Sequence, residues 1–202
     1  MTTKVKEVGH REFREFRSPG GEWSARPPVS GACEVRLNLH PGQVQVWESK
    51  KRWVIAQAST QWGKTCLGPH WLEREMGERG VGDYLAVTAT FPLLNLKMLP
   101  ELKEVFERIL RWGRYKAADR IFESHERLRG EPASRIIVGS AANPESLESA
   151  TAKAAWLDEL GQHQFTREAW DAVVRRLSLA QGRVLGTTTL YELGWYKTEI
   201  YD

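Results

Sequence analysis

The segment from residue 53 to residue 65 constrains the fold more than any other part of the chain. Its first half, Trp-Val-Ile-Ala, is an apolar run that predicts a buried strand. Its second half, residues 58–65, fits the pattern G-x-x-x-x-G-K-[ST] at every defined position except the first, where Ala58 stands in place of glycine. Residues 66–76 are compatible with a helix, so the segment predicts a strand, a tight loop and a helix in direct succession.

This pattern is typical of a loop that binds phosphate groups. Successive backbone N–H groups and the N-terminus of the helix surround the anion, while Gly63 lets the backbone approach closely. Lys64 is expected to place a cation against the β- and γ-oxygens, and the Thr65 hydroxyl to bind Mg²⁺. The tripeptide Gly-Lys-Thr alone can occur by chance at a helix start, but the flanking strand and helix favour the phosphate loop. The residues expected to surround the nucleotide phosphates are Ala58, Ser59, Thr60, Gln61, Trp62, Gly63, Lys64 and Thr65.

Two acids at the end of a second apolar run complement the loop. Residues 154–157, Ala-Ala-Trp-Leu, predict a strand that ends in Asp158 and Glu159. A parallel sheet brings such carboxylates to its C-terminal edge, where a phosphate loop also lies. We expect Asp158 to hold the metal shell, and Glu159 to orient and deprotonate the water that attacks the γ-phosphate. A lone Asp-Glu pair is usually a solvated strand end, and only the phosphate loop gives this pair a function.

A third apolar run, residues 183–186, leads into three hydroxyl residues, Thr187, Thr188 and Thr189. Threonines are good strand formers, so their presence is compatible with sheet propensity alone. In an ATPase with such a phosphate loop and acid pair, the three threonines would lie where a hydroxyl can sense the γ-phosphate. Both interpretations are open from the residues themselves.

The apolar pattern along the chain indicates an α/β fold. Residues 84–88 and 135–139 are short apolar runs, whereas residues 93–112 and 166–179 carry apolar side chains at helical spacing. Strands that alternate with helices predict a mainly parallel central sheet flanked by helices. Residues 114–130 are ambiguous, because the stretches 121–123 and 127–129 form either a short hairpin or a loop.

Composition and charge exclude several classes of protein. The 202 residues, of which 41% are hydrophobic, are enough for one well-cored domain. No apolar stretch approaches the length of a membrane span, and the charged N-terminus lacks the apolar core of a signal peptide, so we expect a cytoplasmic protein without a membrane partner. The isolated Cys33 and Cys66 indicate neither a disulfide framework nor a zinc site. The net charge of +3 permits a nucleic-acid partner without requiring one, and the nine tryptophans are expected to serve mainly as core bulk.

The N-terminal segment differs from the rest of the chain. Residues 1–32 mix basic side chains with proline and glycine and sustain neither a helical nor an alternating period. We predict an extended N-terminal arm over residues 1–32 and a single P-loop ATPase domain over residues 33–202.

Taken together, the motifs resemble the N-terminal ATPase domain of the large terminase subunit of tailed phages or prophages. The likeness extends from about Leu39 to Trp195, and both order and spacing match. The segments that carry it are residues 40–43 (His-Pro-Gly-Gln), 62–65 (Trp-Gly-Lys-Thr), 87–90 (Val-Thr-Ala-Thr), 139–141 (Gly-Ser-Ala), 146–147 (Ser-Leu), 156–159 (Trp-Leu-Asp-Glu) and 186–191 (Gly-Thr-Thr-Thr-Leu-Tyr).

The resemblance implies a P-loop NTPase fold of the ASCE/RecA-like class, which uses ATP and Mg²⁺. It implies a motor that couples ATP hydrolysis to translocation of double-stranded DNA into a procapsid. A homo-oligomeric ring on a portal, a small terminase subunit as partner and the cytoplasm of an infected bacterial host follow from the same resemblance.

Two residue roles also follow from the family rather than from the residues. An upstream glutamine in the family resembles an adenine reader, which makes Gln43 the candidate here; the plain alternative is an exposed polar residue in a helix. The threonine-rich stretch of the family is called the coupling motif, because it links hydrolysis to movement. Thr187, Thr188 and Thr189 take that role by resemblance.

The chain also departs from the family pattern. Many members carry an arginine inside the phosphate loop, where residues 59–61 are Ser-Thr-Gln, and often another directly after the Ser-Leu pair, where this chain has Glu148. A trans-acting cation is then expected from elsewhere, and the candidates are Lys153, Arg127 and Arg129, with an ordinary surface charge as the alternative for each. Large terminases continue into a nuclease domain, whereas this chain ends just beyond the coupling motif, so we expect no nuclease activity from it.

Two other functions are compatible with the same motifs. A helicase-like P-loop ATPase stimulated by nucleic acid shares the loop and the acid pair, and differs in carrying a second RecA-like domain further along the gene. A module that binds ATP without hydrolysing it is compatible with Ala58 and with the missing loop arginine. The path of DNA is not located, because basic residues within 97–129 alternate with glutamates, as on a solvated helix face.

Overall fold

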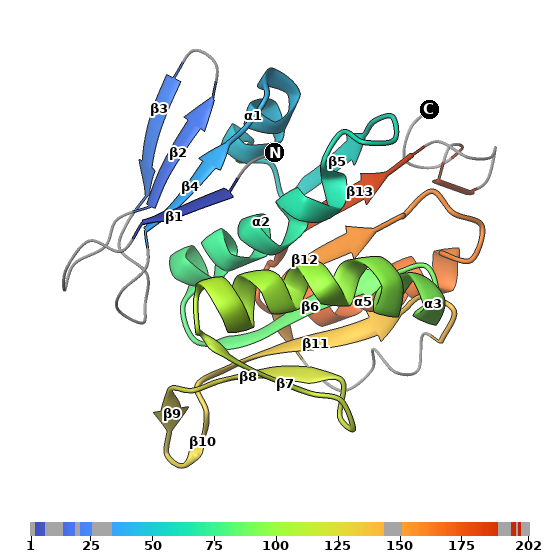
Figure 1. The fold of residues 1–202 in the computed structure, drawn as a ribbon. Helices are drawn as coiled ribbons and strands as arrows, with labels where there is room; N and C mark the ends of the chain where they lie inside the picture. Colours follow the sequence, from blue (N-terminus) through green and yellow to red (C-terminus); the bar gives the residue numbers. More distant parts are fainter. Residues whose placement is uncertain are drawn as a thin grey trace.

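A seven-stranded sheet forms the centre of the fold, as Figure 1 shows. The computed structural model describes residues 34–143 and 151–189, together with Trp195, Tyr196, Thr198 and the backbone of three strands between residues 3 and 25. The first five strands in the spatial order are parallel, and the last two are antiparallel. This confirms the predicted α/β fold with a mainly parallel central sheet. The order is β5 (Trp53–Gln57), β13 (Arg183–Thr188), β12 (Ala152–Asp158), β6 (Gly82–Thr88), β11 (Ser134–Ser140), β8 (Ile121–Ser124) and β7 (Gly113–Lys116).

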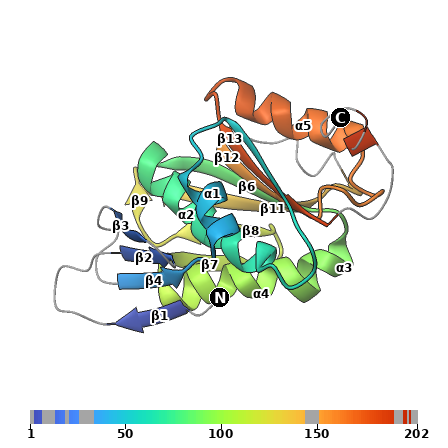
Figure 2. The same cartoon turned by 90° about the horizontal axis from the view of Figure 1, so that it is seen from above.

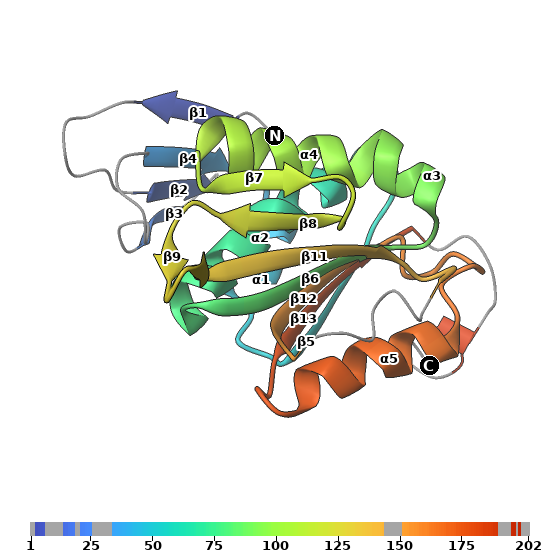
Figure 3. The ribbon, with the colours of Figure 1, turned by 90° about the horizontal axis from the view of Figure 1, so that it is seen from below.

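Helices cover both faces of the sheet. In Figure 2, helix α2 (Lys64–Arg79) and a continuous helical segment over residues 91–109 lie on one side, and α5 (Arg167–Ser178) lies on the other; Figure 3 gives the same arrangement from below. The helical segment consists of α3 (Phe91–Leu93), η1 (Leu94–Met98), α4 (Leu99–Lys103) and η2 (Glu104–Ile109).

The two faces follow from the alternation of side chains along each strand. On β12, Ala154 and Trp156 belong to the core beneath α2, whereas Ala155 and Leu157 belong to the core beneath α5. Successive side chains of a strand point to opposite faces, so a strand buried on both faces must be apolar throughout. This explains why the predicted strands are continuous apolar runs rather than alternating ones.

The hairpin at the far edge of the sheet differs from the pairing considered for residues 114–130. Strand β8 pairs antiparallel with β7 on one side and with β11 on the other. The stretch 127–129 does not pair with it. Instead, β9 (Arg127–Leu128) forms a small two-stranded ladder with β10 (Glu131–Pro132). The apolar face of β8, with Phe122 fully buried, places this strand in the sheet.

A second, smaller sheet precedes the central one. Its order is β1 (Thr3–Lys6), β4 (Glu34–Asn38), β2 (Arg14–Ser18) and β3 (Gly21–Ala25). Helix α1 (Pro41–Glu48) follows β4 and leads to β5. The division of the chain at residue 32 into an arm and a domain stays a prediction. Among the described residues, no helix is both long and apolar enough to cross a membrane.

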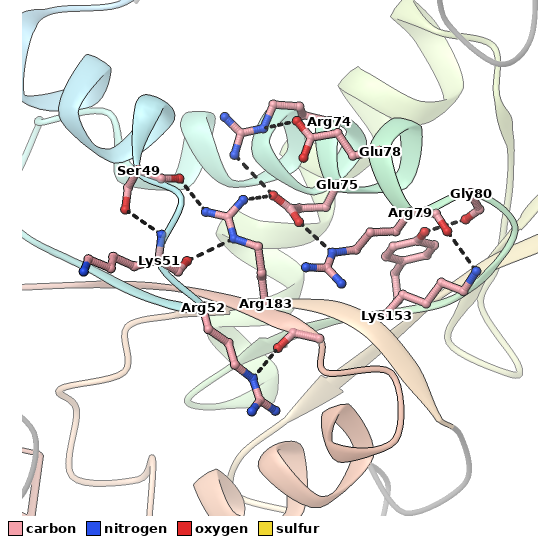
Figure 4. Close-up of polar contacts among 12 residues, drawn as sticks. Ser49, Lys51, Arg52, Arg74, Glu75, Glu78, Arg79, Gly80, Lys153 and Arg183 are labelled. Atoms are coloured by element: carbon pink, nitrogen blue, oxygen red, sulfur yellow. Dashed lines mark hydrogen bonds and ion pairs between the residues drawn. The ribbon is translucent and has the colours of Figure 1, made fainter.

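A buried ionic cluster fixes the end of α2 that lies away from the phosphate loop, as Figure 4 shows. The Glu75 carboxylate is fully buried and accepts hydrogen bonds from the guanidinium groups of Arg74, Arg79 and Arg183. Arg183 begins β13, and it also donates to the backbone carbonyls of Ser49 and Lys51. The cluster therefore ties α2, β13 and the connection from α1 to β5 together at the N-terminal edge of the sheet.

Candidate functional site

The C-terminal ends of three neighbouring strands bring the sequence motifs together. Strand β5 ends in the phosphate loop, β12 ends in the acid pair, and β13 lies between them. The register places Asp158 opposite Thr187, and Thr188 opposite Gln57. Because parallel strands end at the same edge, the three motifs form one site, as expected for this topology.

The backbone of the phosphate loop explains which of its residues must be glycine. Gly63 has a φ of 83°, in the left-handed region, and a Cβ there would lie 2.7 Å from Nε2 of Gln43. Gln61 also has a positive φ, of 66°, whereas Ala58 does not. Alanine at the first position of the motif is therefore compatible with the conformation of this loop.

The Lys64 ammonium group lies within the loop. It donates hydrogen bonds to the backbone carbonyls of Ala58, at 2.9 Å, and Ser59, at 2.7 Å. Burial lowers the pKa of Lys64, and the negative charges of Glu159 and Asp158 oppose that shift. The ammonium group is therefore held by the carbonyls of the loop that the motif assigns to phosphate binding.

Asp158 connects all three motifs. Its Oδ2 accepts a hydrogen bond of 3.2 Å from the Thr65 hydroxyl, and its Oδ1 accepts one of 2.7 Å from the Thr187 hydroxyl. Burial raises the pKa of Asp158 to about 6, while the two threonine hydrogen bonds act in the opposite direction. A buried carboxylate beside a hydroxyl offers oxygen ligands, the type that Mg²⁺ prefers, and a cation would offset the cost of burying the charge. The residues therefore fit a Mg²⁺ ion held by Thr65 and Asp158.

Glu159 follows directly and has a strained backbone. Its φ is 58°, in the left-handed region that a glutamate seldom adopts, and it is only 5% exposed. Its Oε1 lies 3.8 Å from Nζ of Lys97, which comes from the helical segment after β6. Residues held in sparsely populated conformations are concentrated at functional sites. Glu159 comes directly after the last residue of β12, at the edge of the sheet where the phosphate loop lies.

Gln43 contacts the phosphate loop through α1. The side chain is 1% exposed, so the alternative of an exposed polar residue is wrong. Its Nε2 donates to the Trp62 carbonyl at 3.2 Å, and its Oε1 accepts from the His40 backbone N–H at 3.2 Å. His40 caps α1 and its Nε2 lies 3.1 Å from the same Trp62 carbonyl, with the imidazole edge-to-face against the Trp62 ring. The start of α1 and the phosphate loop are therefore held together.

The three threonines at the end of β13 have different contacts. Thr187 is fully buried and bonds Asp158, as described above. Thr188 is also buried; its hydroxyl accepts from the Gly161 backbone N–H at 2.8 Å and donates to the Thr189 carbonyl at 2.9 Å. Thr188 thus holds the turn that follows the acid pair. Sheet propensity alone does not account for hydroxyls placed in this way.

The candidates for a trans-acting cation lie away from this edge. Lys153 is at the start of β12, about 16 Å along the strand from Asp158. Its Nζ donates to the Arg79 carbonyl beside the ionic cluster (Figure 4). Arg127 lies on β9, with its guanidinium 3.5 Å from Glu123, and Arg129 is exposed in the turn after it. Residues 146–148, with the Ser-Leu pair and Glu148, lie outside the described residues.

Two contacts in the site did not follow from the sequence motifs. Lys97 was one basic residue among several on a helix, and only the fold brings it to Glu159. Trp156 lies in an apolar run that predicts a buried strand, and in the structure its indole N–H donates to the Thr187 hydroxyl at 3.0 Å. A donor-only side chain two positions before the first acid was the available hint.

Fold and site together define a class of protein. A phosphate loop with its lysine and hydroxyl, an acid pair on a parallel strand and an intervening strand that ends in threonines give the chain the α/β fold and the motif arrangement of P-loop proteins. No protein-family model matches the sequence, and no curated protein matches it significantly.

Solved structures of phage large terminases share the fold. The ATPase domain of the Thermus phage P74-26 large terminase matches with a TM-score of 0.67 and 20% identity, over 80% of this chain and 69% of that chain. The large terminase of a second, thermophilic bacteriophage matches with a TM-score of 0.63 and 17% identity, over 80% of this chain and 42% of that chain. This second terminase has also been solved in complex with ADP and with ATP-γ-S. The chain therefore has the fold of a large-terminase ATPase domain, and it spans less than half of the second terminase.

Proposed function

We propose that this chain is the ATP-hydrolysing motor domain of a terminase that packages double-stranded DNA. The observation that carries the proposal is the junction at Asp158, where the hydroxyls of Thr65 and Thr187 meet one carboxylate. This junction joins the phosphate loop, the acid pair and the coupling motif through direct hydrogen bonds. The likeness in fold to terminases, one of them solved with nucleotides, supports the same assignment.

The residues divide the work of hydrolysis between them. Lys64, withdrawn from the loop carbonyls, binds the β- and γ-phosphate oxygens, and Thr65 with Asp158 holds Mg²⁺. An ion held there would supply positive charge against the charge that develops on the phosphate oxygens. Glu159 orients a water molecule and accepts its proton, and burial of the carboxylate excludes competing solvent. Gln43, beside the loop, is the proposed reader of the adenine ring.

The wider role follows from the terminase assignment. Thr187, Thr188 and Thr189 relay the loss of the γ-phosphate to movement of DNA. The motor works as a homo-oligomeric ring on a portal, with a small terminase subunit, in the cytoplasm of an infected host. Lys153, Arg127 and Arg129 remain candidates for the cation that completes a neighbouring subunit's site.

The test separates nucleotide binding from hydrolysis. Lys64→Ala is expected to lose both ATP binding and turnover, because the only loop cation is removed. Glu159→Gln is expected to keep binding and to lose turnover by roughly 10²- to 10⁴-fold, because it removes the base and leaves the loop intact. Lys103→Ala, on the surface of α4, is the control for loss of a lysine.

Single-turnover hydrolysis with labelled ATP distinguishes the alternatives. Turnover by both variants at the parental rate contradicts the assignment. Parent protein that retains uncleaved ATP indicates a binding module without hydrolysis. Parental ATPase activity that single-stranded DNA stimulates, with no response to duplex DNA, favours the helicase-like alternative.

A further inference from the structure

Trp156 contacts both the phosphate-loop helix, which is α2, and the coupling strand, which is β13 with Thr187 and Thr188 at its end. It lies two positions before Asp158 on β12, so both side chains point to the face that α2 covers. Its ring is fully buried, and the register places it beside Leu185 of β13. Its indole N–H is directed at the hydroxyl of Thr187, at 3.0 Å.

The hydrogen-bonding capacity of these groups fixes the direction of each bond. An indole N–H is only a donor, so the Thr187 oxygen must accept from Trp156. The single proton of Thr187 is then directed at Oδ1 of Asp158, at 2.7 Å, rather than at the Leu157 carbonyl, at 3.3 Å. The indole therefore holds the hydroxyl in the orientation that donates to the carboxylate.

The same ring also fixes the position of α2. A Cβ on Gly68 would lie 1.9 Å from Cε2 of Trp156, so the indole fills the space that the glycine leaves. Gly68 comes one turn after Thr65, whose hydroxyl bonds the other oxygen of Asp158. Helix α2 thus contacts β12 at Asp158 and at Trp156, and both contacts meet again at Thr187.

We propose that Trp156 is a positioning residue that connects the phosphate-loop helix to the coupling strand, by orienting the Thr187 hydroxyl onto Asp158. The proposal deepens the proposed function and rests on it, because Asp158 is the ligand assigned to Mg²⁺. Groups that hydrogen-bond to metal ligands typically contribute a factor of 10 to 100 to metal affinity. A movement of β13 would therefore change the hydrogen bond that the Thr187 hydroxyl donates to Asp158.

A double-mutant cycle on nucleotide affinity tests the connection. The variants are Trp156→Phe, which keeps an aromatic ring and loses the N–H, Thr187→Val, and the two combined. The readout is the ratio of ADP dissociation constants with Mg²⁺ and with EDTA, measured by calorimetry. Each single variant is expected to reduce the Mg²⁺-dependent gain in affinity roughly tenfold. The double variant is expected to equal Thr187→Val, because the indole N–H that Trp156→Phe removes acts only through that hydroxyl.

Trp71→Phe is the matched control for loss of ring volume. Trp71 is also fully buried and lies on α2, and its indole nitrogen has no hydrogen-bond partner among the described residues. Its substitution is expected to leave the Mg²⁺-dependent gain unchanged. A second readout needs no nucleotide: the Trp156 indole N–H resonance, assigned by its loss in Trp156→Phe, is expected to shift in Thr187→Val.

Three results overturn the proposal. The first is that Trp156→Phe keeps the parental Mg²⁺-dependent gain in ADP affinity. The second is that the free-energy change of the double variant equals the sum of the changes of the two single variants. The third is that Thr187→Val leaves the Trp156 indole resonance unshifted. A parent protein that binds no nucleotide contradicts the proposed function. In that case, the indole resonance still tests separately whether Trp156 donates a hydrogen bond to Thr187.

Discussion

Asp158 is placed where a negative charge is costly in the absence of a cation. The carboxylate is 1% exposed, and burial raises its pKa from 3.8 to about 6. The folded protein therefore binds this proton more tightly than the unfolded chain does. The stability that the protonated carboxyl provides is complete below pH 4 and is lost as the pH rises through about 6.

Asp158→Asn is therefore expected to stabilise the metal-free protein at pH 8, by about 1 to 3 kcal/mol. The gain in unfolding free energy should shrink towards zero at pH 4, where the parental carboxyl is neutral too. Urea-induced unfolding in EDTA across this pH range measures it. The same variant should lose the Mg²⁺-dependent part of nucleotide affinity. If Asp158→Asn is instead less stable than the parent at pH 8, the two threonine bonds outweigh the cost of burial.

Gly63 allows a second prediction, because two separate causes require glycine at this position: the positive φ and the nearby Gln43 side chain. Gly63→Ala meets both a positive φ and the buried Gln43 side chain, so we expect a loss of about 1 to 3 kcal/mol in stability together with loss of nucleotide binding. Gly130→Ala, with a φ of 88° and open space around it, should cost about 1 kcal/mol. Gly77→Ala, exposed within α2, should stabilise by about 0.5 to 1 kcal/mol.

Thermal unfolding of the three alanine variants, with and without nucleotide, measures these differences. Equal losses for Gly63→Ala and Gly130→Ala would mean that Gln43 moves aside without cost. In that case, the contact between α1 and the phosphate loop does not restrict residue 63.

At the residue scale, the sequence predicted residues that the structure brings together at one sheet edge, and it did not predict the side chains that contact them there. Lys64 and Thr65 could be singled out because the spacing of residues 58–65 follows a pattern set by the geometry of phosphate binding, whereas the coupling role of the threonines came from the family resemblance. The contact of Lys97 with Glu159 depends on how the helical segment after β6 lies over the sheet edge. Such contacts arise from tertiary packing and leave no periodicity in the sequence.

At the scale of elements, the position of α2 is fixed at both of its ends. The phosphate loop holds its start, and the Glu75 cluster of Figure 4 holds its end against β13. Glu75→Gln leaves three guanidinium groups without their shared counter-ion, so we expect a loss of about 3 to 5 kcal/mol. Glu78→Gln is the matched control, since Glu78 is 46% exposed and lies 3.7 Å from Arg74; it should cost less than about 1 kcal/mol.

Urea unfolding of both glutamine variants and the parent measures the two losses in unfolding free energy. A loss in Glu75→Gln no larger than that in Glu78→Gln would mean that the three arginines find other partners. The cluster would then not hold α2 in place.

The strands and helices were predictable to a greater extent than their pairing. Each apolar run in residues 53–56, 84–88, 135–139, 154–157 and 183–188 lies within a strand, because strands buried on two faces need continuous apolar sequence. The partner of β8 was not predictable. Residues 113–116 include only one buried residue, and β7 pairs with β8 where the Tyr115 and Phe122 rings pack in a tilted contact with centroids 4.8 Å apart.

At the scale of the whole molecule, the site belongs to the central sheet and should unfold with it. Mg²⁺ with ATP-γ-S at 100 times its dissociation constant is expected to raise the unfolding free energy by about 2.7 kcal/mol. Scanning calorimetry should show one transition that moves to higher temperature. EDTA should remove part of the shift, and Lys64→Ala should remove all of it. A first transition insensitive to nucleotide would show that part of the described fold unfolds independently of the site.

The place of β13 in the sheet has a mechanical consequence. Because β13 separates the loop strand from the acid strand, the phosphate loop and Asp158 cannot move apart without displacing it. Thermodynamic linkage is reciprocal: if nucleotide binding displaces β13, a force that displaces β13 changes nucleotide affinity by the same free energy. For the proposed motor, a tension transmitted into Thr188 that displaces β13 would therefore change the affinity for nucleotide, so that mechanical load and nucleotide binding are coupled through one strand.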